Sequence, residues 1–239
     1  MTNTILRDPA ALRAQLTACV SCSSDCARIV RRPERGVPPR GFALGPGGME
    51  GKVLMLVLVE PTQIAIRADG RDDGLKQLER QRYQRALKLG GMAALAAETE
   101  AVTLGEFAAG KTPGHKRTMG LLRDIFGTSI RAGKRTYVTS LTKCEKEDPP
   151  PGTKEWQIPP ATRSTCFDLH LRREIEIVQP QAILAFGLAG DFADQMGAAR
   201  TVVADHPNKR PGGPGWLYGS ERERTIAAVR ALIGKAATD

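Results

Sequence analysis

The hydrophobic positions of the chain fall into short continuous apolar runs, separated by longer stretches in which apolar and polar residues recur with helical spacing. The runs predict β-strands and the helical spacing predicts helices. The helix that begins near residue 161 should end at Val178, because Gln179 precedes Pro180 and a residue before proline avoids the helical region. We predict strands at 52–59, 135–141, 182–186 and 200–204, and helices at 118–126, 161–178, 188–196 and 221–235, with helical patterns also within 1–18 and 74–109.

Strands that are apolar throughout, and that alternate with helices, are typical of a parallel sheet covered on both faces. We therefore expect an α/β fold of three layers, α/β/α, with a central, mainly parallel sheet of four strands. Residues 1–239 should form a single domain, with a cysteine-containing N-terminal segment at 1–51 and a helical insertion at about 70–112. The Pro- and Gly-rich stretches at 31–51 and 148–160 are predicted to be loops.

Several polar residues follow directly after the predicted strands. Ligands of parallel sheets bind beyond the carboxyl ends of the strands, so these residues should share one site. Glu60 could act there as a general base or stabilise a developing cation, or it could be a helix cap or a surface charge. His206 could be catalytic or structural. The residues at the strand ends are Glu60, Pro61 and Thr62, then Ser140 to Cys144, Gly187, and Asp205 to Asn208.

The composition favours a soluble protein with an anionic partner. The chain has 239 residues, 41% of them hydrophobic, and no apolar run approaches the ~20 residues of a membrane span. The N-terminus lacks an apolar signal core, so we expect a cytoplasmic protein that does not contact a membrane. The net charge of +9 favours nucleic acid as the partner, and scattered surface Lys and Arg are the alternative explanation.

The five cysteines indicate a metal site more than a disulfide framework, because their number is odd and no export signal is present. Cys19 and Cys22 are spaced as a chelating turn, while Cys144 and Cys166 come from two other places in the chain. Four thiolates of this origin suit a 4Fe-4S cluster better than zinc, which is the alternative. Cys26 would be the spare. Cys144 and Cys166 could instead be small buried residues.

The order of these motifs resembles the uracil-DNA glycosylase superfamily, most of all its iron–sulfur, family 4-like members. The resemblance runs from about residue 19 to residue 208. It includes Cys19-x2-Cys22 with Arg28, a strand that ends in LVEPTQ, a strand that leads into TSLTKC (139–144), Pro160-x5-Cys166, PQAILAFGLA (180–189) and a final strand that ends in HPN (206–208).

The resemblance implies a uracil-DNA glycosylase-like fold and an enzyme that flips a nucleotide out of DNA and hydrolyses its N-glycosidic bond. It implies that Glu60 activates water and stabilises the oxocarbenium-like transition state, although the iron–sulfur members carry their acid one position earlier, at Val59 here. His206 would donate to the base oxygen that gains charge. Lys209 and Arg210 would contact phosphates or fill the gap left by the flipped base. Pro61, Thr62, Gln63 and Asn208 would line the base site, and Cys19, Cys22, Cys144 and Cys166 would hold a structural cluster.

Two positions of the base site depart from the family pattern. Ser140 stands where the family has an asparagine that reads the uracil edge, and a hydroxyl is shorter than an amide and rotates. Gly114, after Pro113, stands where an aromatic ring stacks on uracil. About forty inserted residues, rich in Lys and Arg between residues 76 and 88, follow the first strand. These departures favour a base larger than uracil.

The sequence therefore predicts a DNA glycosylase for an enlarged or modified pyrimidine, such as the decorated cytosines of bacteriophage DNA, with a role in antiviral defence. We expect DNA as its partner and a monomer. One alternative is a repair glycosylase for uracil or another deaminated base. Another is a non-catalytic iron–sulfur module that binds DNA. A small-molecule enzyme is disfavoured because no GxGxxG or P-loop motif follows the first strand.

Overall fold

The computed structural model describes residues 12, 15, 19, 21, 42–44, 51–59, 88, 113–143, 157–205 and 219–234. Within these residues, five strands form a sheet in the order β1-β3-β2-β4-β5. Neighbours among β2 to β5 are parallel, and β1 pairs antiparallel with β3. The predicted mainly parallel α/β sheet of four strands is thus confirmed, with β1 as a short addition. The strands are β1 (Phe42–Leu44), β2 (Leu54–Leu58), β3 (Thr136–Ser140), β4 (Ala182–Phe186) and β5 (Thr201–Ala204).

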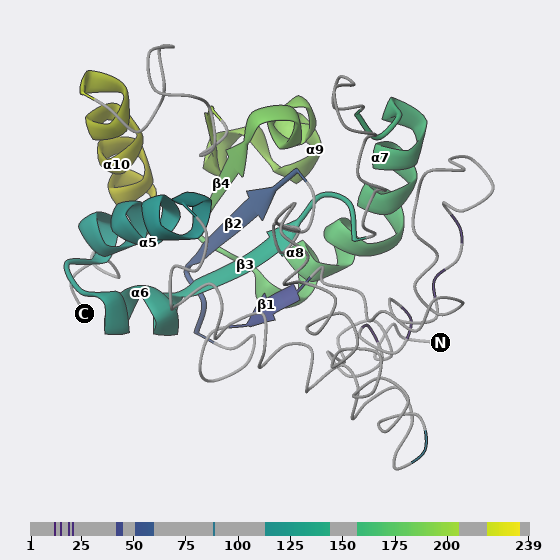
Figure 1. The fold of residues 1–239 in the computed structure, drawn as a ribbon, viewed down its shortest axis with the longest axis horizontal. Helices are drawn as coiled ribbons and strands as arrows, with labels where there is room; N and C mark the ends of the chain where they lie inside the picture. Colours follow the sequence, from purple (N-terminus) through teal and green to yellow (C-terminus); the bar gives the residue numbers. More distant parts are fainter. Residues whose placement is uncertain are drawn as a thin grey trace, which may run out of the picture.

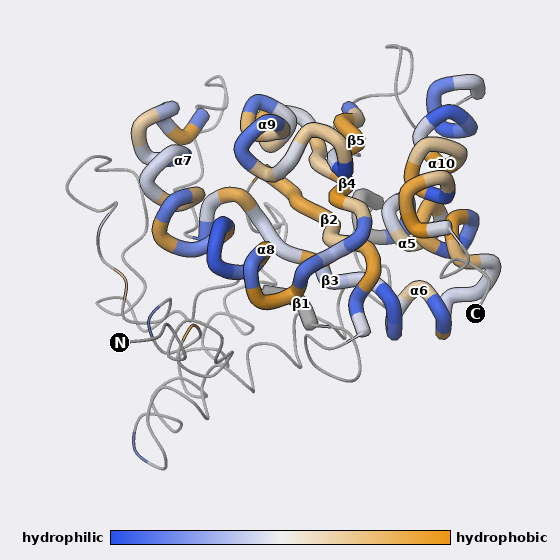
Figure 2. Tube along the Cα trace, turned by 180° about the vertical axis from the view of Figure 1, so that it is seen from behind, coloured by the Kyte–Doolittle hydropathy of each residue, from blue (hydrophilic) through white to orange (hydrophobic). Residues whose placement is uncertain are grey.

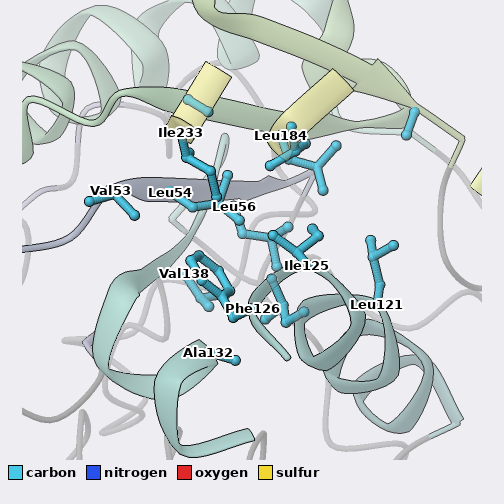
Figure 3. Close-up of a cluster of buried hydrophobic side chains, with 14 of the residues drawn as sticks. Val53, Leu54, Leu56, Leu121, Ile125, Phe126, Ala132, Val138, Leu184 and Ile233 are labelled. Atoms are coloured by element: carbon cyan, nitrogen blue, oxygen red, sulfur yellow. The ribbon is translucent and has the colours of Figure 1, made fainter. Parts of the chain in front are cut away.

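Helices cover both faces of the sheet (Figure 1). Alternate residues of each strand point to opposite faces, which divides the core into two clusters. On one face, Leu54, Leu56 and Leu184 pack with residues of α5 and α10 (Figure 3). On the other face, Met55 and Ile183 pack with residues of the helices that follow β3 and β4. The helices are α5 (Pro113–Phe126), α6 (Ser129–Arg135), α7 (Pro160–Cys166), the π-helix η2 (Phe167–Leu171), α8 (Arg172–Val178), the 3-10 helices η3 (Gly187–Phe192) and η4 (Ala198–Arg200), α9 (Ala193–Met196) and α10 (Ser220–Ile233).

The helix predicted at 161–178 is present as the continuous run α7, η2 and α8, with one π-helical segment in the middle. It ends where the sequence predicts. Gln179 leaves the right-handed helical region, with φ 48° and ψ 52°, and its N–H donates to the carbonyl of Ile175 at 2.9 Å. Figure 2 shows β2 and β4 as largely hydrophobic tubes, while the helices alternate between hydrophilic and hydrophobic segments.

Two elements were not predicted. The strand β1 lies in the segment 31–51, which was predicted to be a loop, and its three residues are too few to give a periodic signal. Helix α6 has seven residues, and its ends are held by other groups. The Thr128 hydroxyl accepts from the N–H of Arg131, and Lys52 Nζ donates to the carbonyls of Gly133 and Lys134 at 3.2 and 2.9 Å.

Two predicted helices differ in detail from the observed ones. Helix α5 begins at Pro113 rather than at residue 118, which is consistent with the preference of proline for the first helical turn. The helix predicted at 188–196 is split into η3 and α9. The insertion at about 70–112 lies outside the described residues apart from Lys88, which is helical. Among the described helices, none has the length and apolarity needed to cross a membrane.

Gly190 allows η3 to pack closely on the edge strand β5. A Cβ atom at Gly190 would overlap Cγ1 of Val203, whose side chain is otherwise 53% exposed. The absence of a side chain at this position therefore sets the distance between η3 and β5.

We predict that Gly190→Ala lowers the free energy of unfolding by about 1–3 kcal/mol, because the methyl group overpacks against Val203. Adding Val203→Ala should restore most of that loss. Gly120→Ala in α5 is the matched control, since nothing lies within 4 Å of its added Cβ, and it should stabilise by up to ~1 kcal/mol. Urea unfolding of the wild type and these three variants tests the prediction. Equal losses in Gly190→Ala with and without Val203→Ala would contradict this packing.

Candidate functional site

The carboxyl ends of the four parallel strands meet at one edge of the sheet. Leu58 at the end of β2 is in register with Ser140 at the end of β3, and Phe186 at the end of β4 is in register with Ala204 at the end of β5. Convergence of these four ends was predicted from the sequence and is confirmed. The residues predicted for the site that lie outside the described part are Glu60, Pro61, Thr62, Gln63, Cys144, His206, Asn208, Lys209 and Arg210, together with Cys22.

The backbone just before Glu60 is held by the segment that follows β3. The N–H of Leu141 donates to the carbonyl of Leu58 at 2.7 Å, and both the N–H and the hydroxyl of Thr142 donate to the carbonyl of Val59 at 3.1 Å. Val59 itself is buried. Hydrogen bonds therefore fix the backbone up to the carbonyl of Val59, the residue before Glu60. A carboxylate at position 59 would be buried.

The strand order separates the ends of β2 and β5 by the end of β4. Two strand spacings amount to about 10 Å, which a nucleotide-sized group can bridge. Gly187 stands between them at the end of β4 with φ 54°, in the left-handed region that glycine tolerates best. Gly187, in the middle of the edge, therefore carries no side chain. The ends of β2 and β5, which precede Glu60 and His206 in the chain, lie on either side of β4.

Ser140 is buried, with 3% of its surface exposed. Its register with Leu58 places its side chain on the face of the sheet that α5 covers, because partners in parallel strands share a face. Gly114 lies in the first turn of α5, at the end of that helix remote from α6. The two positions that depart from the family pattern thus belong to β3 and to the helix packed on the same face.

Two of the four predicted metal ligands lie within the described residues. Cys166 is buried at the end of α7, and the backbone N–H of Lys143 donates to its Sγ at 3.5 Å. Cys19 is half-buried. Cys144 follows Lys143 directly in the sequence, so the residue before Cys144 contacts the side chain of Cys166 through its backbone. An N–H directed at a buried sulfur is the kind of outer contact that tunes metal-bound thiolates. The described residues contain no group of three or more potential metal ligands, and with Cys22 and Cys144 outside them the ligand set stays a prediction.

The N-terminal segment packs against the long helix that carries Cys166. Leu12 is buried in the hydrophobic cluster that includes Phe167 and Leu171, and Arg173 of α8 donates to the side chain of Gln15. Both Leu12 and Gln15 are helical, in agreement with the helix predicted within residues 1–18. Leu12 and Gln15 therefore lie against the helix run that carries Cys166.

A buried polar network lies beneath the end of β3 and was not predicted. Lys143 Nζ donates to Thr139 Oγ1 at 2.5 Å and to the Ser140 carbonyl at 2.6 Å, and it lies 2.6 Å from Glu174 Oε1. Glu174 Oε2 accepts from the hydroxyls of Thr139 and Tyr137 at 2.6 and 3.1 Å. The sequence did contain a signal, because Glu174 falls among the apolar helix positions Leu171, Ile175 and Val178.

Burial and charge shift the titration of two groups on the long helix. Burial, with the positive charges of Lys143 and Arg173, lowers the pKa of His170 from 6.5 to about 3. Burial also raises the pKa of the Glu174 carboxyl, while Lys143, Thr139 and Tyr137 act in the opposite direction. His170 lies in the π-helix η2 and is neutral at physiological pH.

Comparison with known proteins adds no relative. No protein-family model matches the chain, and a search among curated proteins finds no match. The functional interpretation therefore rests on the ordered motifs of the sequence and on the geometry of the sheet edge.

We predict that His170 makes the protein less stable as the pH falls. The folded imidazole has a pKa of about 3 and stays neutral, whereas the unfolded one takes up a proton below about 6.5. Its contribution to stability is thus fully present above pH 6.5 and is lost towards pH 3. Between about pH 7 and pH 5, urea unfolding of the wild type should lose about 2 kcal/mol more than that of His170→Gln. Parallel losses in the two proteins would contradict this burial.

Proposed function

We propose that this protein is a DNA glycosylase that flips a nucleotide out of DNA and hydrolyses its N-glycosidic bond, leaving an abasic site. The observation that carries the proposal is the convergence of the ends of β2, β3, β4 and β5 at one edge, with Ser140 there and with Glu60 and His206 two positions after the last residues of β2 and β5 in the chain. The order of these three positions along the chain is the one in the family that the sequence resembles.

The proposed chemistry divides between the two outer segments of this edge. Glu60 takes a proton from a water molecule whose oxygen bonds to the sugar carbon C1′. The bond from C1′ to the base nitrogen breaks, and its electrons leave with the base. The carboxylate also stabilises the positive charge that develops on the sugar. His206 donates a hydrogen bond to the departing base, which gains negative charge. Lys209 and Arg210, which follow His206, contact the phosphates of the DNA.

For the base, we propose an enlarged or modified pyrimidine, such as a phage-type modified cytosine, and hence a role in antiviral defence. Ser140 is shorter than the asparagine of the resembling family, and Gly114 places no ring at its own position in the first turn of α5. The two positions lie on one face of the sheet, so they would enlarge the same side of the base site. Pro61, Thr62, Gln63 and Asn208 would complete that site.

We also propose a 4Fe-4S cluster held by Cys19, Cys22, Cys144 and Cys166. When bound, such a cluster would cross-link the N-terminal segment, the end of β3 and the long helix, which is a structural role. The N–H of Lys143 directed at Cys166 Sγ and the contact of Gln15 with Arg173 support this arrangement. Zinc in the same four thiolates is the alternative.

Base release identifies the substrate. Mass spectrometry would follow free bases from DNAs that contain uracil, hypoxanthine, hydroxymethylcytosine or glucosylated hydroxymethylcytosine. We expect release of a modified cytosine. The rate of release should fall at least about 100-fold in Glu60→Gln and in His206→Ala, because each variant removes a group that stabilises one charge of the transition state.

Lys88→Ala serves as the control, since it removes a charge of the insertion and leaves the proposed chemistry intact. Release of uracil alone would identify a repair glycosylase and contradict the enlarged base site. Strong, salt-dependent DNA binding with no base released from any substrate would contradict catalysis and identify a DNA-binding module.

The purified protein should be brown and contain iron and sulfide. Cys166→Ser should lose most of the iron and unfold more readily, because the free energy of metal binding adds to that of folding. Cys26→Ser, the matched control, should keep the iron of the wild type. A colourless protein with stoichiometric zinc after anaerobic preparation would show that the site holds zinc instead.

A further inference from the structure

Lys143 is turned inward, although its place in the TSLTKC motif, just after the carboxyl end of β3, would suit a contact with phosphate. Its side chain is 1% exposed, and that of Glu174 is fully buried. A residue this deeply buried does not reach the backbone of DNA. Its role must therefore concern the groups that its ammonium contacts within the protein.

The ammonium of Lys143 makes both hydrogen bonds and an ion pair. It donates hydrogen bonds to Thr139 Oγ1 and to the Ser140 carbonyl, which belong to the last two residues of β3, and it forms an ion pair with Glu174 Oε1 of α8 at 2.6 Å. The backbone N–H of the same residue contacts Cys166 Sγ. One residue thus ties the end of β3 to the long helix at two places, through its side chain at Glu174 and through its backbone at Cys166.

The hydroxyls of β3 complete the network from the other side. Tyr137 and Thr139 both donate to Glu174 Oε2, so the carboxylate is bound by two alternate residues of the strand as well as by Lys143. All of these groups are buried. The end of β3, which includes Ser140, is consequently held by a buried set of charged and hydroxyl groups.

Stability alone gives no reason for such a pair. Removing two charges from water costs as much as their attraction returns in many proteins, and apolar replacements of buried ion pairs are often neutral or stabilising. What an ion pair provides and an apolar pair does not is a defined geometry, because each hydrogen bond fixes a distance and a direction. Here, the fixed groups are the carbonyl of Ser140 and the amide that faces Cys166.

We propose that Lys143, held by Glu174, is a positioning residue that fixes Ser140 at the end of β3 relative to the helix that carries Cys166. The inference rests on the proposed function in taking Ser140 as a position that contacts the base. It assigns to Lys143 no contact with DNA or with the reacting atoms.

The test compares two double variants that each remove one positive and one negative charge. Lys143→Met/Glu174→Gln removes the buried pair, and Asp168→Asn/Arg172→Met removes the half-exposed pair on the same helix run. For each protein as isolated, we would measure the melting temperature, the kcat and KM of base release, and the hydrogen exchange of the amides of residues 139–143.

For the buried pair, we expect a melting temperature within about 5 °C of the wild type. The kcat should nevertheless fall at least about tenfold with little change in KM, because small displacements of a site residue slow the chemical step. Exchange at 139–143 should become faster. The control variant should match the wild type in all three. If the double variant does not fold, Tyr137→Phe removes one hydroxyl, keeps both charges and should show smaller changes of the same kind.

A folded buried-pair variant with the kcat of the wild type would overturn the proposal, and so would unchanged exchange at 139–143. If the wild type releases no base from any DNA, the proposed function fails. The exchange measurement alone then decides whether the pair positions the strand end, since faster exchange supports it and unchanged exchange refutes it.

Discussion

Strand β2 pairs with a parallel strand on each side, and the arrangement of the edge depends on those two ladders. Leu58 is set against Ser140 of β3, and Val57 is set against Ala185 of β4, so the three strands end together. The hydrogen bonds continue past the strand, where Thr142 holds the carbonyl of Val59. A slip of two residues in either ladder would keep the faces of the sheet unchanged and still separate the strand ends. The register therefore decides which polar residues share one place.

Beneath this edge, the fold buries charge where an apolar contact would hold the layers together equally well. Lys143 and Glu174 lie between β3 and α8, in the same layer as the hydrophobic cluster of Met55, Val57 and Phe167. An apolar pair would pack there without fixing the direction of any backbone group. The same layer contains His170, kept neutral by its surroundings, and Cys166, which receives the amide of Lys143. Specific geometry is thus concentrated on the face that carries the proposed cluster.

The sequence predicted those parts of the fold that local patterns encode. The strands β2, β4 and β5 are continuous apolar runs. The long helix ends at Val178, as expected from Gln179 and Pro180. The strand β1 and helix α6 were missed because both depend on partners distant in the chain: β1 on β3, and α6 on Lys52. Ser140 was predicted at the end of a strand and Cys166 in the long helix, where the structure has them. The link between them through Lys143 could not be derived from the spacing of the motifs along the sequence, because it forms only when these segments are folded together.

The central claim, that Glu60 stabilises a sugar cation while His206 donates to the departing base, can be tested for Glu60 without knowing the base. The measurement is the affinity for a DNA duplex with a pyrrolidine nucleotide, whose protonated ring nitrogen mimics the cation, against the same duplex with a neutral tetrahydrofuran nucleotide. A glycosylase binds the mimic of its transition state more tightly, so we predict a preference of about 100-fold or more that disappears in Glu60→Gln. Equal affinity of the wild type for the two duplexes would contradict the account.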